Sequence, residues 1–145
     1  MLPPFNSDGD LPAGIHAADW SDVEQRFGKN PEVRVRAYAK LRHLHELANC
    51  TGALLRFLVF GSFVSTAAAP RDVDVILVMA ADFRLEDAPR ESRTLLSHPD
   101  AEARYGASVF WVREGMLPEE LMRDFLETWQ TKRDGTKRGI VEIKS

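Results

Sequence analysis

Two short groups of residues near the middle of the chain have the types and spacing to bind a phosphate and a metal ion. The first is Gly61-Ser62, directly after an apolar run, and the second is Asp72-Val73-Asp74, after a gap of nine residues. Glycine lets a backbone approach another group closely, and the amide groups after it can point at an anion together with the Ser62 hydroxyl. Gly61 and Ser62 are therefore predicted to form a phosphate-binding loop.

The two aspartates lie two positions apart at the expected start of a strand. Their carboxylates then leave the same face, with Cα atoms roughly 6.5–7 Å apart. Such a pair is tolerated when it is solvated or when a cation lies between the acids, and Mg²⁺ (or Mn²⁺) prefers carboxylates, water and phosphates. Asp72 and Asp74 are thus predicted to be metal ligands and catalytic residues. Arg71, directly before them, either pairs with an acid or binds the phosphates.

Each half of this pattern is weak evidence when taken alone. An Asp-x-Asp at the start of a strand is often a turn with solvated acids, and a lone Gly-Ser pair is weaker still. Here an apolar strand, Gly-Ser, the nine-residue gap and Asp-x-Asp are followed by the apolar run Val75-Ile76-Leu77-Val78. That combination supplies the structural context that a motif needs, and it favours a functional site.

This arrangement, over about residues 54–79, resembles the DNA polymerase beta-like nucleotidyltransferase superfamily, in particular its small one-domain bacterial members, the minimal nucleotidyltransferases. The resemblance implies that Gly61 and Ser62 contact a nucleoside triphosphate and that Asp72 and Asp74 hold Mg²⁺. An NMP group would move to an acceptor hydroxyl or phosphate with release of pyrophosphate. Such proteins often act with a partner, including in toxin–antitoxin pairs, so the implied acceptor is a toxin-like protein or an RNA. Three flanking segments resemble a poorly characterised bacterial branch of the superfamily: residues 2–5, 11–16 and 137–141.

The chain departs from the superfamily pattern at a third carboxylate, which active members usually carry on the next strand. The matching run, residues 105–112, contains no acid, and Ser108 stands where one is expected. Glu102 and Glu114 flank this run and reach the site only in another register. An alternative function is therefore a catalytically degenerate, nucleotide-binding or antitoxin-like regulatory protein. A weaker alternative is a structural module with solvated acids.

A basic cluster near the C-terminus and three tryptophans are further candidates for contact with a ligand. The cluster comprises Lys132, Arg133, Lys137 and Arg138. It is expected to be a solvated turn, with contact to triphosphate or RNA as the alternative. Trp20, Trp111 and Trp129 are expected to pack in the core rather than to stack on a base.

The order of the expected helices and strands predicts an α/β or α+β fold. The resemblance to the nucleotidyltransferase superfamily implies, more specifically, a mixed β-sheet with helices packed on it. Residues 1–18, rich in Pro and Gly, are expected to be an extended arm that lies on a single domain spanning residues 19–145. A helix capped by Asn30 is expected to bury Val33, Ala37, Leu41, Leu44 and Ala48, and Pro99 is expected to end a later helix. The other expected elements are helices at 19–27, 86–105 and 118–130, and strands at 54–60, 73–79, 107–112 and 139–143.

The overall composition restricts the function classes that the chain can belong to. Its 145 residues suit one domain, and a net charge of −3 provides no global basic field for nucleic acid. Cys50 is the only cysteine, which excludes an intrachain disulfide and fits a reducing cytoplasm. Neither a secretory signal nor a run long enough to span a membrane is expected. The oligomeric state stays open.

Overall fold

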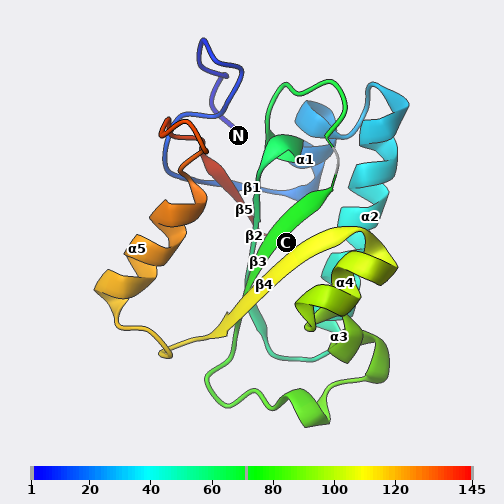
Figure 1. The fold of residues 1–145 in the computed structure, drawn as a ribbon. Helices are drawn as coiled ribbons and strands as arrows, with labels where there is room; N and C mark the ends of the chain where they lie inside the picture. The colour runs from blue at the N-terminus through cyan, green and yellow to red at the C-terminus, as the bar shows by residue number, and fades with distance from the viewer. Residues whose placement is uncertain (1, 71, 145) are drawn as a thin grey trace.

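The computed structural model describes residues 2–70 and 72–144, which form one five-stranded sheet with helices on both faces (Figure 1). The elements in chain order are β1 (Ile15–Ala18), α1 (Trp20–Phe27), α2 (Glu32–Asn49), β2 (Leu54–Phe60), the 3₁₀ turn η1 (Ser62–Val64), β3 (Val73–Met79), the 3₁₀ turn η2 (Leu85–Asp87), α3 (Arg90–Leu95), α4 (His98–Tyr105), β4 (Ala107–Arg113), α5 (Glu119–Trp129) and β5 (Ile140–Ile143). The predicted mixed sheet with packed helices is confirmed, and the fold is α+β.

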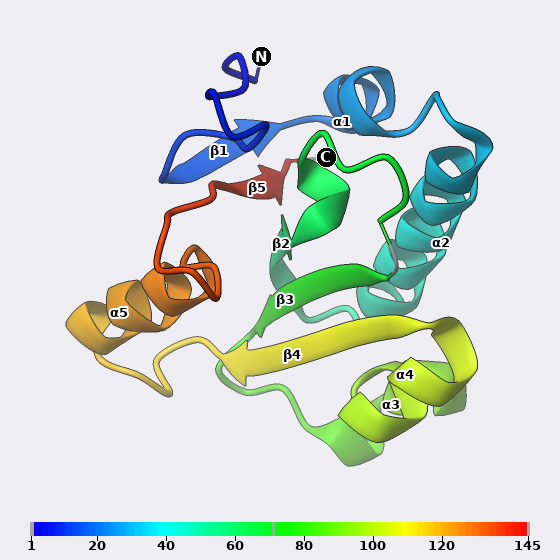
Figure 2. The ribbon, with the colours of Figure 1, turned by 45° about the horizontal axis from the view of Figure 1, so that its top comes forward.

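The strand order is β1-β5-β2-β3-β4, which Figure 2 shows from top to bottom. Strand β2 runs antiparallel to both β3 and β5, whereas β4 is parallel to β3 and β1 is parallel to β5. The strand bounds 54–60 and 73–79 agree with the expectation from sequence. No helix in the described part of the chain is long and apolar enough to cross a membrane.

The two faces of the sheet bury different side chains because residues alternate along a strand. On β3, Val73, Val75 and Leu77 belong to the larger apolar cluster, which is covered by α1 to α4. The intervening Ile76 and Val78 belong to a smaller cluster under α5. Figure 1 shows α5 alone to the left of the sheet and α2, α3 and α4 to its right. Asp74 has the same parity as Ile76, so it lies on the α5 face.

The start of α2 differs from the expectation. The helix begins at Glu32, its N-cap is Pro31, and no side chain caps it, so the prediction of Asn30 as N-cap is wrong. Val33 is 37% exposed, whereas the next residue, Arg34, is 5% exposed. Leu41, Leu44 and Ala48 are buried as predicted, so the prediction is wrong only at Val33, in the first turn. Arg34 is buried there instead, because it finds enough hydrogen-bond acceptors inside the protein.

The structure also differs from the expectation at Pro99 and shows where the N-terminal residues lie. Pro99 does not end a helix: it lies in the first turn of α4, which begins at His98 after Ser97. Proline is tolerated there because the first amides of a helix have no partner within it. The expected N-terminal arm contributes β1 to the sheet, and Leu2 and Leu11 are buried. Residues 2–18 therefore pack against the rest of the described chain, and their last four residues are part of its sheet.

Candidate functional site

The turn after β2 places the Gly61 backbone directly against the carboxylate of Asp74. Gly61 has φ +82° and ψ −161° and is followed by the 3₁₀ turn that Ser62 begins. Its neighbour Phe60 pairs with Asp74 in the antiparallel register of β2 and β3. A β-carbon on Gly61 would overlap Asp74 Oδ2. Glycine is required here both for its backbone conformation and for this close approach.

Asp74 is the acid that the fold places in a partly buried position on the α5 face. Burial raises the pKa of its carboxyl from 3.8 to about 6. Hydrogen bonding from the Ser108 hydroxyl and the positive charge of Arg138 lower this pKa, while the negative charge of Asp72 raises it. Ser108 lies opposite Asp74 in the parallel register of β3 and β4.

Two of the other predicted site residues, Asp72 and Ser62, lie in the described part of the chain. Asp72 is exposed and directly precedes β3. It lies beside Gly106: a β-carbon placed on Gly106 would be 3.8 Å from Asp72 Oδ1 and 3.0 Å from Lys40 Nζ. Ser62 is half-buried, and its carbonyl accepts a hydrogen bond of 2.7 Å from Ser65 Oγ. Arg71, predicted to bind nucleotide, lies outside the described residues.

A cavity of about 640 Å³ opens where Gly61 meets Asp74. Gly61, Asp74 and Ser108 line it at the sheet. Neither Asp72 nor Ser62 is among its lining residues. The predicted residues that the fold brings together at this cavity are therefore Gly61 and Asp74.

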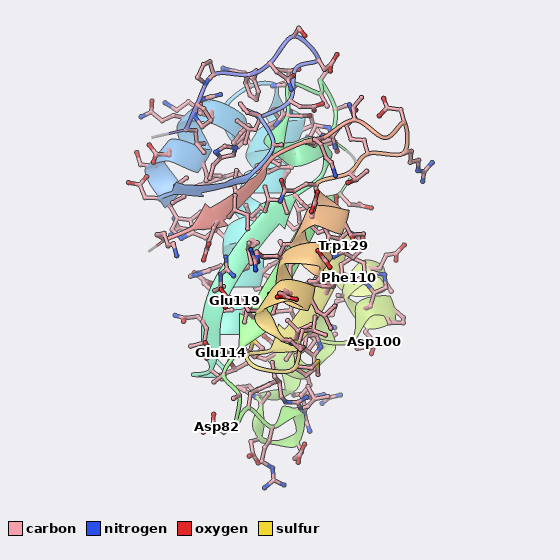
Figure 3. The ribbon with its side chains drawn as sticks, turned by 90° about the vertical axis from the view of Figure 1, so that its left-hand side faces the viewer. Asp82, Asp100, Phe110, Glu114, Glu119 and Trp129 are labelled. Carbon is pink, nitrogen blue, oxygen red and sulfur yellow. The ribbon has the colours of Figure 1, made fainter. Side chains whose placement is uncertain are left out.

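One wall of the cavity is aromatic and comes from three separate elements, β2, β4 and α5. The ring of Trp129 lies 4.9 Å from that of Phe60 and 4.5 Å from that of Phe110, measured between centroids. Figure 3 shows Phe110 close to Trp129, the last residue of α5. Trp129 was expected in the core, and it packs on the smaller apolar cluster, but it is also part of the cavity wall.

The turn between α5 and β5, which carries the basic cluster, forms a cationic wall of the same cavity. Lys132, Arg133 and Arg138 line the cavity together with Asp134. The cluster was expected to be solvated, but the side chains of Lys132 and Arg138 are mostly buried, with exposed fractions of 26% and 21%. The sequence identifies the cluster, but not that three of its members line the same cavity as Gly61 and Asp74.

Lys137, the remaining member of the cluster, is directed elsewhere. Its Nζ donates to Thr131 Oγ1 at 2.8 Å and lies 3.4 Å from Glu127 Oε1. It lines a second, smaller cavity of about 390 Å³, between α5 and the start of β1. The cluster therefore divides between two cavities.

The loop after Ser62 is held by a residue that the sequence did not single out. Arg34 donates to the carbonyl oxygens of Phe63, Ser65 and Ala67, with distances of 2.6–3.2 Å. It also donates to the Phe27 carbonyl at 3.2 Å. These bonds satisfy the buried guanidinium and fix the backbone between Ser62 and β3.

The acids near the cavity suit a metal ion that keeps substrate and water among its ligands. In residues 2–70 and 72–144, no group of three or more His, Cys, Asp or Glu side chains is placed to hold an ion. Asp74 and Asp72 offer two carboxylates, and Mg²⁺ commonly binds through one or two carboxylates plus phosphates and water. The donor set thus fits Mg²⁺ that arrives with a phosphate ligand.

Comparison with known proteins gives one match. Residues 3–144 match a family described as "Family of unknown function (DUF6932)". No curated protein and no solved structure matches the chain.

Proposed function

The chain belongs to the DUF6932 family, and we propose that it is a Mg²⁺-dependent (or Mn²⁺-dependent) nucleotidyltransferase of the cytoplasm. It would move an NMP group from a nucleoside triphosphate to an acceptor, either a toxin-like partner protein or an RNA. Asp72 and Asp74 would hold the metal ion. Gly61, Ser62 and Arg71 would bind the triphosphate.

The observation that carries this proposal is the contact between the Gly61 backbone and the Asp74 carboxylate at the edge of a cavity with one cationic and one aromatic wall. A volume of about 640 Å³ lies within the usual range of small-molecule pockets. The cationic wall, with Lys132 and Arg138, suits phosphates, and the aromatic wall, with Trp129, suits the face of a base. The two walls would orient the α-phosphate toward Asp74.

The proposed reaction is a displacement at the α-phosphorus. An acceptor oxygen forms a bond to this phosphorus, the bond from it to the oxygen bridging to the β-phosphate breaks, and pyrophosphate leaves. The acceptor proton passes to solvent or to a carboxylate. A bound Mg²⁺ would neutralise charge that develops on the phosphates. The residues of this chain position the triphosphate through Gly61 and the basic turn.

A specific observation favours a second candidate function, nucleotide binding without transfer by a regulatory or antitoxin-like protein. The residue opposite Asp74 on β4 is Ser108, whose hydroxyl adds no charge to a metal site. A third carboxylate there would serve as base toward the acceptor and would help hold a second metal ion. Binding of a triphosphate needs neither role.

The two candidates are separated by label transfer and binding measured on the same preparation. The chain is incubated with α-labelled ATP, CTP, GTP or UTP, with Mg²⁺ or Mn²⁺ and with cell lysate. The expected result is label on a protein or RNA acceptor, lost in the double variant Asp72→Asn with Asp74→Asn. The matched control is Asp82→Asn with Glu114→Gln, two exposed acids toward the opposite end of the molecule from Trp129 (Figure 3).

Three outcomes decide between the functions. Label transfer that only the first double variant abolishes supports the nucleotidyltransferase. Metal-dependent triphosphate binding without any transfer supports the second candidate. If no triphosphate or metal stabilises the chain in thermal denaturation, both proposals are wrong.

A further inference from the structure

A buried carboxylate in the N-terminal arm binds two of the cations that line the cavity. Asp10 Oδ2 accepts a hydrogen bond of 2.9 Å from Lys132 Nζ, and Asp10 Oδ1 accepts one of 2.8 Å from Arg138 Nε. The Asp10 side chain is 3% exposed. Asp10 itself does not line the cavity, whereas both of its partners do. Asp10 is therefore placed to act on a ligand through Lys132 and Arg138.

Both cations keep hydrogen-bond donors beyond those used by Asp10. Arg138 gives Asp10 its Nε, so its two terminal nitrogens take no part in that contact, and the Lys132 ammonium carries three protons. Lys132 and Arg138 line the same cavity as Gly61 and Asp74. Arg138 also acts electrostatically on Asp74, since its charge lowers the pKa of that carboxyl. The pair is thus placed to bind an anion beside Asp74.

Without Asp10, the two cations would repel each other and would be free to turn toward solvent. Long cationic side chains lose considerable rotamer freedom when a ligand fixes them, and this loss weakens binding. Asp10 fixes them before the ligand arrives. Its carboxylate leaves one positive charge uncompensated in the trio, so the wall stays attractive to phosphate.

The arm also connects the basic turn to the loop after Ser62. Asp10 forms a β-bridge with Ser65, and the carbonyl of Gly9 accepts hydrogen bonds from the Thr66 amide and hydroxyl, at 2.9 and 3.1 Å. The turn that presents Asp10 is closed by Asn6, whose Oδ1 accepts from the Asp10 amide at 3.1 Å. Asp10 therefore lies where the proposed phosphate loop and the cationic wall meet.

We propose that Asp10 is a positioning residue for the triphosphate, which holds Lys132 and Arg138 in the orientation that binds the phosphates. This inference rests on the proposed function, because it concerns the same cavity. It assigns to the N-terminal arm a role in ligand binding, in addition to its packing against the domain.

The test compares Asp10→Asn with a matched buried carboxylate elsewhere on the sheet. Glu142 is 7% exposed at its side chain and holds Arg56 and Lys144 at 2.8 and 2.9 Å, but it does not line the cavity. Calorimetry measures the binding of the four ribonucleoside triphosphates and of inorganic tripolyphosphate, each with Mg²⁺. Saturation-transfer NMR measures the binding of an uncharged nucleoside, the one that corresponds to the triphosphate with the highest affinity.

Asp10→Asn is expected to weaken triphosphate and tripolyphosphate binding about tenfold and to leave nucleoside binding unchanged. Glu142→Gln is expected to change none of the three. In the Lys132→Met background, Asp10→Asn should cost less affinity, because one of the cations through which it acts is gone. If Asp10→Asn does not fold, Asp10→Glu replaces it: this variant displaces the cations by one methylene and should show the same selective loss.

Three results overturn the inference. Unchanged triphosphate binding in Asp10→Asn, or an equal loss for nucleoside and triphosphate, leaves the proposed function intact and shows that Asp10 only attaches the arm. Absence of triphosphate binding by the unmodified chain overturns the proposed function and this inference together.

Discussion

Ser108 lies directly opposite Asp74, in the register that joins β4 to β3, on the face of the sheet that α5 covers. Its hydroxyl lowers the pKa of the Asp74 carboxyl, which burial has raised. Ser108 thus supports the carboxylate without adding a charge. The affinity of the proposed metal site should depend on this position more than on any other on β4.

Ser108→Asp is expected to strengthen the response to Mg²⁺. Without metal, a third carboxylate beside Asp74 repels the carboxylates already there. With Mg²⁺ bound, it provides one more ligand to the metal ion. We expect a lower melting temperature than the unmodified chain in EDTA at pH 8, and an additional rise of roughly 3 °C on saturation with Mg²⁺. Thermal denaturation followed by circular dichroism measures both.

The control for this prediction is Ser108→Asn, which has nearly the same size as Ser108→Asp but no charge. It should show no additional response to Mg²⁺. An equal response of the two variants would show that the metal does not bind beside residue 108.

Asp74→Asn is expected to change how stability depends on pH. The Asp74 carboxyl titrates near 3.8 in the unfolded chain and at about 6 in the folded chain, so the folded state binds more protons between these values. The contribution of the protonated Asp74 carboxyl to the free energy of unfolding is fully present below pH 4 and is lost as the pH rises through 6. Without metal at pH 7.5, Asp74→Asn should therefore be more stable by about 2 kcal/mol.

Urea denaturation in EDTA at pH 4, 5, 6 and 7.5 measures this difference. The free energies of unfolding of the two proteins should converge toward pH 4. A difference that stays constant across this range would mean that Asp74 is not responsible for it.

Gly61→Ala is expected to destabilise the chain more than an alanine at a matched glycine. Gly61 and Gly115 have nearly the same φ, +82° and +81°, but a β-carbon on Gly61 would overlap Asp74 Oδ2 while one on Gly115 meets nothing within 4 Å. Gly115→Ala should cost roughly 1–2 kcal/mol, from backbone strain alone. Gly61→Ala should cost about 1–2 kcal/mol more, because the carboxylate must move.

The second step of this test is the double variant Gly61→Ala with Asp74→Ala, also measured by urea denaturation. Removal of the carboxylate should bring the cost of Gly61→Ala close to that of Gly115→Ala. If the cost is unchanged, the close approach of Gly61 to Asp74 is not what requires glycine.

The part of the site that sequence predicts is local in the chain. Strands 54–60 and 73–79 are apolar runs interrupted only by Arg56 and by Asp74, and such runs are a short-range signal. They are joined by a short connection and pair antiparallel, so Gly61 and Asp74 meet as soon as the register is set. The position of Ser108 follows in the same way once β4 is placed beside β3.

The rest of the site depends on contacts between distant parts of the chain. Asp10 is separated from Lys132 and Arg138 by 122 and 128 residues, and no local pattern relates them. The spacing of apolar residues along α2 predicts that Val33 points into the core. Arg34 is buried instead, because the carbonyl groups that it binds belong to the loop after Ser62. The spacing of apolar residues within a helix carries no information about such distant acceptors.

Arg34→Met is expected to destabilise the chain by about 3–5 kcal/mol, because it leaves several carbonyl groups buried without their donor. Arg34→Lys should recover little, since one ammonium does not span acceptors as separated as Phe63 and Ala67. The matched control is Arg36→Met on the same helix: Arg36 is 76% exposed at its side chain, so the change should stay within about 0.5 kcal/mol. Urea denaturation measures all three.

Hydrogen exchange distinguishes a general loss of stability from a local effect on the loop after Ser62. In Arg34→Lys, under conditions where the protein stays folded, amides at residues 63–67 should exchange faster relative to those of β3. Triphosphate affinity should fall together with this protection, because the same loop carries the proposed phosphate contacts. Full protection of the loop in Arg34→Lys would show that Arg34 stabilises α2 and not the candidate site.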